Sequence, residues 1–166
     1  MLISTSRKPS QKTRKLCKNL SHTLNYPYVN RGKSSIHDLQ VKSKQLEQEG
    51  IILIYEIKGN PSKITFLDIS GEETFNMQIS AETTNDRLNI RPSQLIIKQD
   101  FPDLNPLAKL LNLPLENNTL ENCIHMRKSN NREKSNGYIA AIDFYNKFGE
   151  ITDFKINIKK LSNLGV

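Results

Sequence analysis

The sequence predicts an α/β fold, in which helices pack on mixed β-sheets. Apolar runs of strand length, such as IILIYEI (51–57), are typical of strands covered on both faces. Two segments between residues 10 and 50 instead carry apolar residues at helical spacing. After a polar stretch at 80–93, the order of strand, helix and further strands recurs. Helices and strands that alternate in this way indicate a sheet with helices packed on it.

The first half is expected to contain a strand, two helices and three more strands. LIST (2–5) is short and β-branched, which favours a strand. Ser10 is a suitable N-cap for a helix whose leucines then recur every four residues, up to the NYPY segment. A second helix is predicted from Ile36 to just before Gly50, with Asp38 in its first turn. The following strands are predicted at 51–57, 63–69 and 75–79, with the segment KGNPS as the turn between the first two.

The second half is expected to follow a linker at residues 80–93, which are polar and end in Pro92. We expect one domain over residues 1–166, with an N-terminal half of about 1–82 and a C-terminal half of about 90–166. The predicted elements are a strand at 93–99, a helix at 103–112, a strand at 122–128, a loop at 129–137 and a hairpin of strands at 138–146 and 151–160.

Basic residues are concentrated at the N-terminal end of the chain. Residues 1–44 hold ten Lys or Arg against one acid, Asp38, so their charge is +9. The whole chain has a net charge of +7, so the remaining residues are slightly acidic. Such asymmetry indicates a polyanionic partner on one surface, although a lysine-rich solubilising surface is the alternative. An amphipathic, Arg- and Ser-rich N-terminus is also typical of a cleaved targeting peptide. A strand at 2–5 argues against cleavage, because the sheet would lose it.

Motifs for catalysis or for metal binding are absent from the sequence. There is no phosphate-binding Gly-rich motif, no HExxH, no GxSxG and no paired CxxC. The two cysteines, Cys17 and Cys123, are expected to be reduced and partly buried. Cys123 and His125 would share one face of a strand, but no third group is evident to orient the histidine. We therefore predict no enzyme, no cofactor and no metal.

Three polar segments, TSRKPS, NRGKSS and KGNPSK, are suited to binding phosphate. The first two precede predicted helix N-termini, where backbone N–H groups and the helix dipole favour an anion. The third contains glycine and two lysines. Tyr26 and Tyr28 could stack on bases or could belong to the core. The candidate RNA-binding residues are Arg7, Lys8, Ser10, Lys12, Arg14, Arg31, Lys33, Lys58 and Asn60.

The segments LISTSRKPSQKTRKLCKNL, YVNRGKSSIHDL and GNPSKITFLD resemble, in order and spacing, the Brix-domain family, in particular its short archaeal members. The resemblance implies two α/β halves, each similar to the anticodon-binding domain of class II aminoacyl-tRNA synthetases. It also implies a non-enzymatic role in ribosome biogenesis with binding to ribosomal RNA. Within the family motif, Asn60 and Pro61 match the GNP turn, and the RNA-facing residues would be Arg7, Lys8, Lys12, Arg14, Arg31 and Lys33.

The predicted function is therefore a non-enzymatic RNA-binding ribosome-assembly factor. Its expected partners are ribosomal RNA or pre-rRNA and other assembly proteins, and we expect a cytoplasmic monomer with no membrane partner. One alternative is a protein-interaction scaffold in a preribosomal particle without RNA affinity of its own. Another is a small enzyme acting on RNA through Cys123 and His125.

Overall fold

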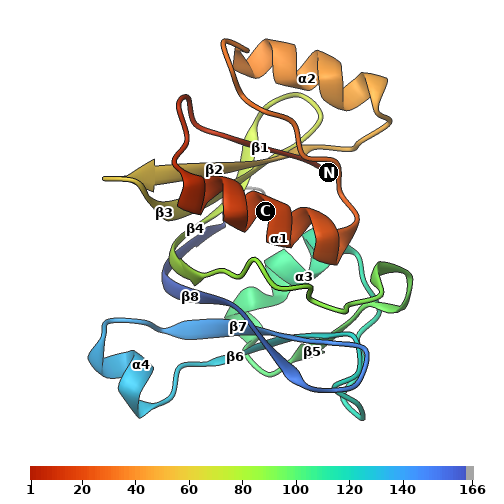
Figure 1. The fold of residues 1–166 in the computed structure, drawn as a ribbon, viewed down its shortest axis with the longest axis vertical. Coiled ribbons are helices and arrows are strands. Elements are labelled where there is room, and N and C mark those ends of the chain that lie inside the picture. Colours follow the sequence, from red (N-terminus) through yellow and green to blue (C-terminus); the bar gives the residue numbers. More distant parts are fainter. Residues whose placement is uncertain (164–166) are drawn as a thin grey trace.

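A single eight-stranded mixed sheet runs through the protein, and its strand order is β1-β2-β3-β4-β8-β7-β6-β5. The structure is a computed structural model that describes residues 1–163 (Figure 1). Its strands are β1 (Leu2–Thr5), β2 (Ile51–Ile57), β3 (Asn60–Leu67), β4 (Glu73–Glu82), β5 (Ile96–Gln99), β6 (Cys123–Lys128), β7 (Ala140–Tyr145) and β8 (Ile151–Asn163). Its helices are α1 (Gln11–Leu24), α2 (Ile36–Gln45), α3 (Asn105–Leu111) and α4 (Asn131–Ser135), with short 3₁₀ turns at Pro92–Gln94 and Pro102–Leu104.

The strand pairing of the first half recurs in the second. β1 lies parallel to β2, which continues antiparallel through β3 to β4, and β5, β6, β7 and β8 repeat this pattern. The two sets join where β4 pairs antiparallel with β8. Even a local detail is shared: Ile3 donates its N–H to the Pro27 carbonyl at 2.8 Å, and Ile97 donates to Pro114 at 2.9 Å. The two halves therefore repeat one architecture.

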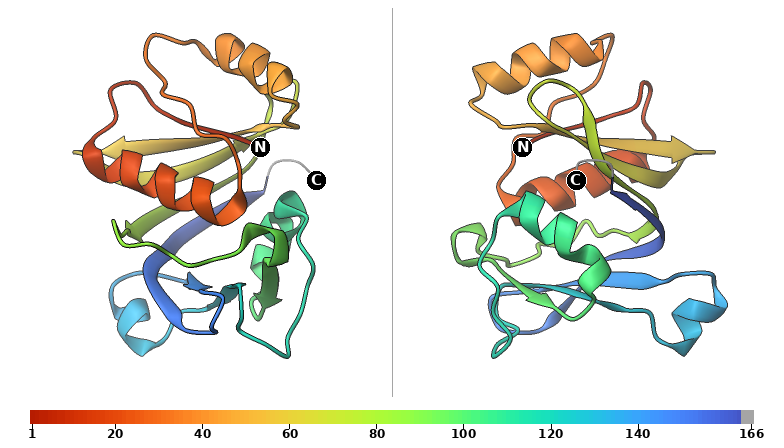
Figure 2. Two further views of the ribbon diagram at one scale, coloured as in Figure 1. Left: turned by 45° about the vertical axis from the view of Figure 1, so that its right-hand side comes forward. Right: turned by 180° about the vertical axis from the view of Figure 1, so that it is seen from behind.

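The main hydrophobic core lies on the inner face of this curved sheet. Figures 1 and 2 show α1 and α3 enclosed between the strands of the two halves. Leu16 and Leu20 bring the apolar face of α1 into this core. An aromatic pair occurs at the matching place in each half: Phe66 meets Phe75 edge-on at 5.8 Å, and Phe144 stacks on Phe154 at 4.1 Å. Within residues 1–163, no helix has the length and apolar character needed to cross a membrane.

A second, smaller core lies on the outer face of the first half, under α2. Leu39 of α2 packs there with Leu2, Ile51 and Leu53. β1 and residues 51–54 of β2 are thus covered on both faces and buried, as predicted, whereas Ile57 at the end of the apolar run is 66% exposed. Between α3 and β6 the structure contains no helix corresponding to α2. The outer face of the second half instead carries charged side chains, including Arg127 and Asp143.

The predicted strands at 2–5 and 51–57 and the Ser10 cap are confirmed. Other segments differ: the predicted strand at 93–99 begins only at Ile96, after a 3₁₀ turn, and the second helix ends at Gln45. The β2–β3 turn consists of Lys58 and Gly59 alone, both with positive φ (51° and 78°), so Asn60 already belongs to β3. The predicted loop 129–137 contains the one-turn helix α4, because Asn130 and Glu133 form a capping box. Residues 80–82 of the predicted linker extend β4.

The rest of the predicted linker, residues 83–91, is an ordered segment that we call the bridging segment. Asn19 of α1 clamps Thr84 with two hydrogen bonds of 3.0 Å, one to its carbonyl and one from its N–H. Leu88 is buried in the main core. The N–H of Arg91 donates to the side chain of Asn122 at 2.8 Å. The segment is therefore attached to both halves.

Candidate nucleic-acid interface

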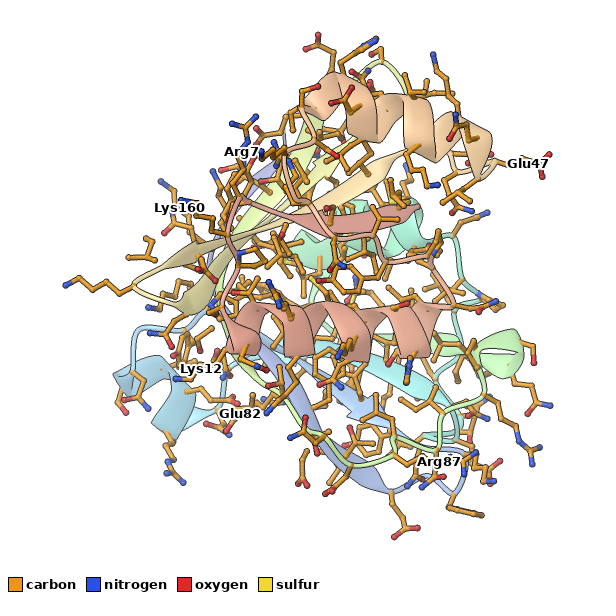
Figure 3. All side chains as sticks on the ribbon, turned by 45° about the horizontal axis from the view of Figure 1, so that its top comes forward. Arg7, Lys12, Glu47, Glu82, Arg87 and Lys160 are labelled. Atoms are coloured by element: carbon orange, nitrogen blue, oxygen red, sulfur yellow. The ribbon has the colours of Figure 1, made fainter. Side chains whose placement is uncertain are left out.

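The three predicted basic segments meet where β1 and β2 end. Arg31 of the second segment donates to the carbonyl of Thr5, the last residue of β1, at 2.9 Å. Ser10 of the first segment donates its hydroxyl to the carbonyl of Gly59, in the β2–β3 turn, at 2.7 Å. Figure 3 shows Arg7 and Lys12 projecting on the side of the molecule where this turn lies. Segments separated by up to 50 residues thus form one surface.

We call this surface the basic edge. Its members are exposed cations, and within residues 1–163 none of them forms an ion pair. Lys12 donates from Nζ to Oδ1 of Asn60 at 3.2 Å, which joins α1 to the hairpin. Because nearby acids do not neutralise these charges, the surface attracts polyanions. The members are Arg7, Lys8, Lys12, Arg14, Lys33 and Lys58.

Ser10, predicted to contact RNA, has a structural role as the cap of α1. Its Oγ accepts the Thr13 N–H at 3.3 Å, while its own N–H donates to the carboxylate of Glu56 at 2.9 Å. The Thr13 hydroxyl also donates to that carboxylate. An acid from β2 therefore occupies the helix N-terminus at which a phosphate was predicted to bind.

Glu56 is charged at neutral pH despite its partial burial. Desolvation by itself would raise the pKa of this carboxyl group. Hydrogen bonds from the Thr13 hydroxyl and from Ser10 act in the opposite direction, and the net pKa is lowered. The ionised Glu56 is thus already hydrogen-bonded to the first turn of α1.

Arg31, also predicted to contact RNA, is buried and only 8% exposed. Its Nε donates to the Ser34 carbonyl at 2.8 Å, in addition to its bond with Thr5. The guanidinium therefore ties the NRG loop to the end of β1, and this internal use explains why it does not face solvent. Lys33, two residues on, remains exposed next to Gly32, whose φ of 51° favours glycine.

Tyr26 and Tyr28 are placed by the structure against the main core rather than on the basic edge. Burial raises the pKa of both hydroxyl groups. The Tyr28 hydroxyl is buried without a hydrogen-bond partner among the described residues. Of the two alternatives for these residues, the structure therefore supports the core.

A polar row on the outer face of the sheet was missed by sequence reasoning. The strand registers place Tyr55 beside Lys63, Lys63 beside Gln78, and Gln78 beside Lys160. The ammonium of Lys63 lies 4.7 Å from the centre of the Tyr55 ring. A hollow of about 380 Å³ is lined by Tyr55, Lys63, Gln78 and Lys159. Alternation along each strand signals which residues face outward, but only the register brings them into one row.

The pair Cys123 and His125 gains a third partner in the structure. Nε2 of His125 lies 2.6 Å from a carboxylate oxygen of Asp100, a group that the sequence did not connect with it. Cys123 is fully buried, however, and burial raises the pKa of its thiol. A buried, protonated thiol is a poor nucleophile. Within residues 1–163, no group of three or more His, Cys, Asp or Glu side chains could hold a metal ion.

Comparison with known proteins agrees with this architecture. A protein from Methanothermobacter thermautotrophicus described as a "probable Brix domain-containing ribosomal biogenesis protein" is 42% identical over 73 residues, which is 44% of either chain. A protein of the same description from Archaeoglobus fulgidus is 34% identical over 107 residues, which is 64% of this chain and 65% of the relative. The chain is a homologue of archaeal Brix-domain proteins. The predicted family resemblance is thereby confirmed, although the matched parts span only 44% to 65% of these two relatives.

Two solved structures are similar to this chain over its whole length. The crystal structure of Mil, an archaeal Imp4-like protein, has a TM-score of 0.83 at 25% identity and covers 99% of this chain and 100% of its own. A probable ribosomal biogenesis protein from Aeropyrum pernix K1 has a TM-score of 0.71 at 16% identity, with 99% and 96% coverage, and so shows the fold alone. No family model matches the chain.

Proposed function

We propose that this Brix-domain homologue acts in ribosome biogenesis by binding ribosomal RNA or pre-rRNA through its basic edge. The observation that carries the proposal is that hydrogen bonds join the TSRKPS, NRGKSS and KGNPSK segments and the start of α1, which together carry six exposed cations free of ion pairs in residues 1–163. The archaeal relatives are described as ribosomal biogenesis proteins, which supports ribosome biogenesis as the process in which this RNA binding takes part.

The geometry supports contacts with the phosphate backbone of RNA more than readout of its base sequence. Arg and Lys side chains on an open surface neutralise phosphates and position a protein on nucleic acid without reading its sequence. If about six phosphates are neutralised, the logarithm of affinity should fall with the logarithm of salt concentration with a slope of about −4 to −5. The neighbouring row with Tyr55 and Lys63 supplies a partly exposed aromatic ring on which a base could stack.

We further propose that each half has the architecture of an anticodon-binding domain of class II aminoacyl-tRNA synthetases. The repeated set of one parallel and two antiparallel strand pairings supports this assignment. The N-terminal half would be the main RNA-facing half, because it contributes every member of the basic edge.

A filter-binding experiment with a structured ribosomal RNA fragment tests the proposal. Reversal of two charges in Arg7→Glu/Lys12→Glu should weaken binding by at least about tenfold and flatten the salt dependence. The matched control is Lys42→Glu/Lys44→Glu, which makes the same charge change in the last turn of α2. It should weaken binding by less than about threefold, by bulk charge alone. An equal loss of RNA affinity in both variants would contradict binding at the basic edge. So would an RNA affinity of the native protein that hardly changes with salt concentration.

The second candidate function is a protein-interaction scaffold without RNA affinity. The exposure of large apolar side chains in the second half favours it, because such residues often mark protein contacts. Leu115 is 65% exposed, Phe148 63% and Ile151 59%. Absence of RNA retention on the filter at physiological salt would favour the scaffold over the RNA-binding function.

A further inference from the structure

A second group of cations lies away from the basic edge, at the C-terminal end of α1. Arg87 and Arg91 of the bridging segment and Lys147 of the β7–β8 turn line a cavity of about 480 Å³. His22 and Asn25, at the end of α1, line it as well. In Figure 3, Arg87 projects on the side of the molecule opposite to Arg7. This cavity is therefore separate from the surface described above.

The cations of this cavity carry uncompensated charge. No Asp or Glu lines the cavity, and in the described chain neither arginine nor Lys147 forms an ion pair. The contrast with the outer face of the second half is direct, because Arg127 and Lys155 there both bind Glu133. Concentration of one sign of charge in a concave site raises the local concentration of counter-ions. The cavity is thus expected to attract anions.

The backbone that carries these cations is fixed at several points. Asn19 clamps Thr84 on one side of Arg87, and Leu88 is buried on its other side. Lys147 donates its N–H to the Asn89 carbonyl at 2.9 Å, which joins the β7–β8 turn to the bridging segment. A site held in place before binding loses less entropy when the ligand arrives. The cavity is therefore preorganised, although its arginine side chains are exposed.

A row of basic side chains connects the basic edge with the cavity. Arg14, Lys18 and His22 are all exposed and follow one another at four-residue spacing on α1, so they share one helix face. Eight residues of helix rise about 12 Å, which about three to four stacked nucleotides would span. A strand bound at the basic edge can follow this face to the cavity.

We propose that this cavity binds one phosphate-bearing nucleotide unit of an RNA chain. Arg87, Arg91 and Lys147 would hold the phosphate, which suits the bidentate geometry of guanidinium groups. The amides of Asn25 and Asn89 would hydrogen-bond the sugar or the base edge. The volume lies within the range of pockets that accommodate small ligands. The inference rests on the proposed function and extends the RNA path from the first half to the junction of both halves.

The test compares Arg87→Glu/Arg91→Glu with the control Lys42→Glu/Lys44→Glu, using a 12-nucleotide single-stranded RNA and, separately, adenosine 5′-monophosphate. RNA affinity of the cavity variant should fall by about tenfold, against less than about threefold in the control. The mononucleotide should shift the amide NMR signals of residues 87–91 in the native protein. The milder variant Arg87→Ala/Lys147→Ala, with an unchanged melting temperature, should also lose RNA affinity.

The outcomes separate this inference from the proposed function. If the variant at Arg7 and Lys12 loses RNA affinity while the cavity variants bind RNA like the control, the cavity assignment is overturned and the proposed function stands. If the mononucleotide binds at residues 87–91 but the native protein retains no RNA, the assignment to an RNA chain is overturned in favour of a free nucleotide. Loss of RNA affinity in the cavity variants, with the mononucleotide bound at residues 87–91 of the native protein, supports the inference.

Discussion

The carboxylate of Glu56 accepts a hydrogen bond from the Ser10 backbone N–H at 2.9 Å, which places an acid from β2 at the N-terminus of α1. The same carboxylate accepts a bond from the Thr13 hydroxyl. Because the helix dipole is positive at this end, the acid stabilises the helix start. The contact also holds the β2–β3 hairpin against the loop that carries Arg7. Glu56 thus helps to assemble the basic edge without belonging to it.

Substitution Glu56→Gln should lower the free energy of unfolding by about 1 kcal/mol at pH 7, because a charged acceptor becomes a neutral one. The folded protein has a lowered pKa at Glu56. Its stabilising contribution is therefore present above the unfolded pKa and is lost as pH falls through the folded pKa. Urea unfolding at pH 7 and at pH 3 should show the difference between native protein and variant shrinking in acid. Glu72→Gln, in an exposed turn, is the control and should change little.

Arg31→Ala should lower the free energy of unfolding by about 2 kcal/mol, since the Thr5 and Ser34 carbonyls each lose a charged donor. The matched control Lys33→Ala removes an exposed cation two residues away and should cost less than about 0.5 kcal/mol. Urea unfolding measures both. If the two variants were equally stable but Arg31→Ala alone lost RNA affinity, Arg31 would be a direct RNA contact after all.

Local signals account for the elements that the sequence predicted well. The Ser10 cap and the strand at 51–57 follow from residues within one turn or one strand. The helix α4 was missed because its five residues are too few for a periodic pattern, although the residues of its capping box lie only three positions apart. Its stability comes from the Asn130–Glu133 capping box and from the contact of Glu133 with Arg127 on β6. Tertiary contacts of this kind are invisible to periodicity.

The candidate site was predictable in its location but not in its detail. Charge asymmetry identified the basic segments, and the structure brings them together. The sequence could not show that Arg31 turns inward, because an arginine in a Gly-containing loop looks the same whether it binds a carbonyl or a phosphate. It also could not show the cavity at Arg87 and Lys147, whose residues come from segments about 60 positions apart.

Among the charged residues of the second half, the buried acid Glu133 should be the one whose substitution destabilises the protein most. It binds both Arg127 and Lys155, and its side chain is 8% exposed. Glu133→Ala should destabilise the protein by about 3 kcal/mol, because removal of one partner leaves the Arg127 guanidinium without its main counter-charge. Glu121→Ala, at an exposed position, is the control. Urea unfolding at pH 7 that found both variants within about 0.5 kcal/mol would contradict the importance of the network.

The ion pairs of Glu133 with Arg127 and Lys155 also predict a loss of stability in acid. The hydrogen bond from Arg127, with those from Lys155 and Asn130, lowers the pKa of Glu133 to about 2 in the folded protein from an ordinary value of 4.5. Its contribution is complete above pH 4.5 and is lost as pH falls from there towards 2. The stability of the native protein should therefore decrease over this interval more steeply than that of Glu133→Ala. Parallel pH curves for the two proteins would contradict the assignment.

The thiols provide a direct test of the enzyme alternative. Both cysteines are fully buried, and burial raises the pKa of Cys17 to about 12 and raises that of Cys123 as well. Since only an accessible thiolate reacts rapidly, a disulfide reagent at pH 8 should modify neither cysteine in the folded protein and both in 6 M guanidinium. Mass spectrometry of the labelled peptides distinguishes the two. Rapid labelling of Cys123 in the folded state, abolished by His125→Ala, would instead reveal a nucleophile activated by the His125–Asp100 pair and would revive catalysis as a function of this face.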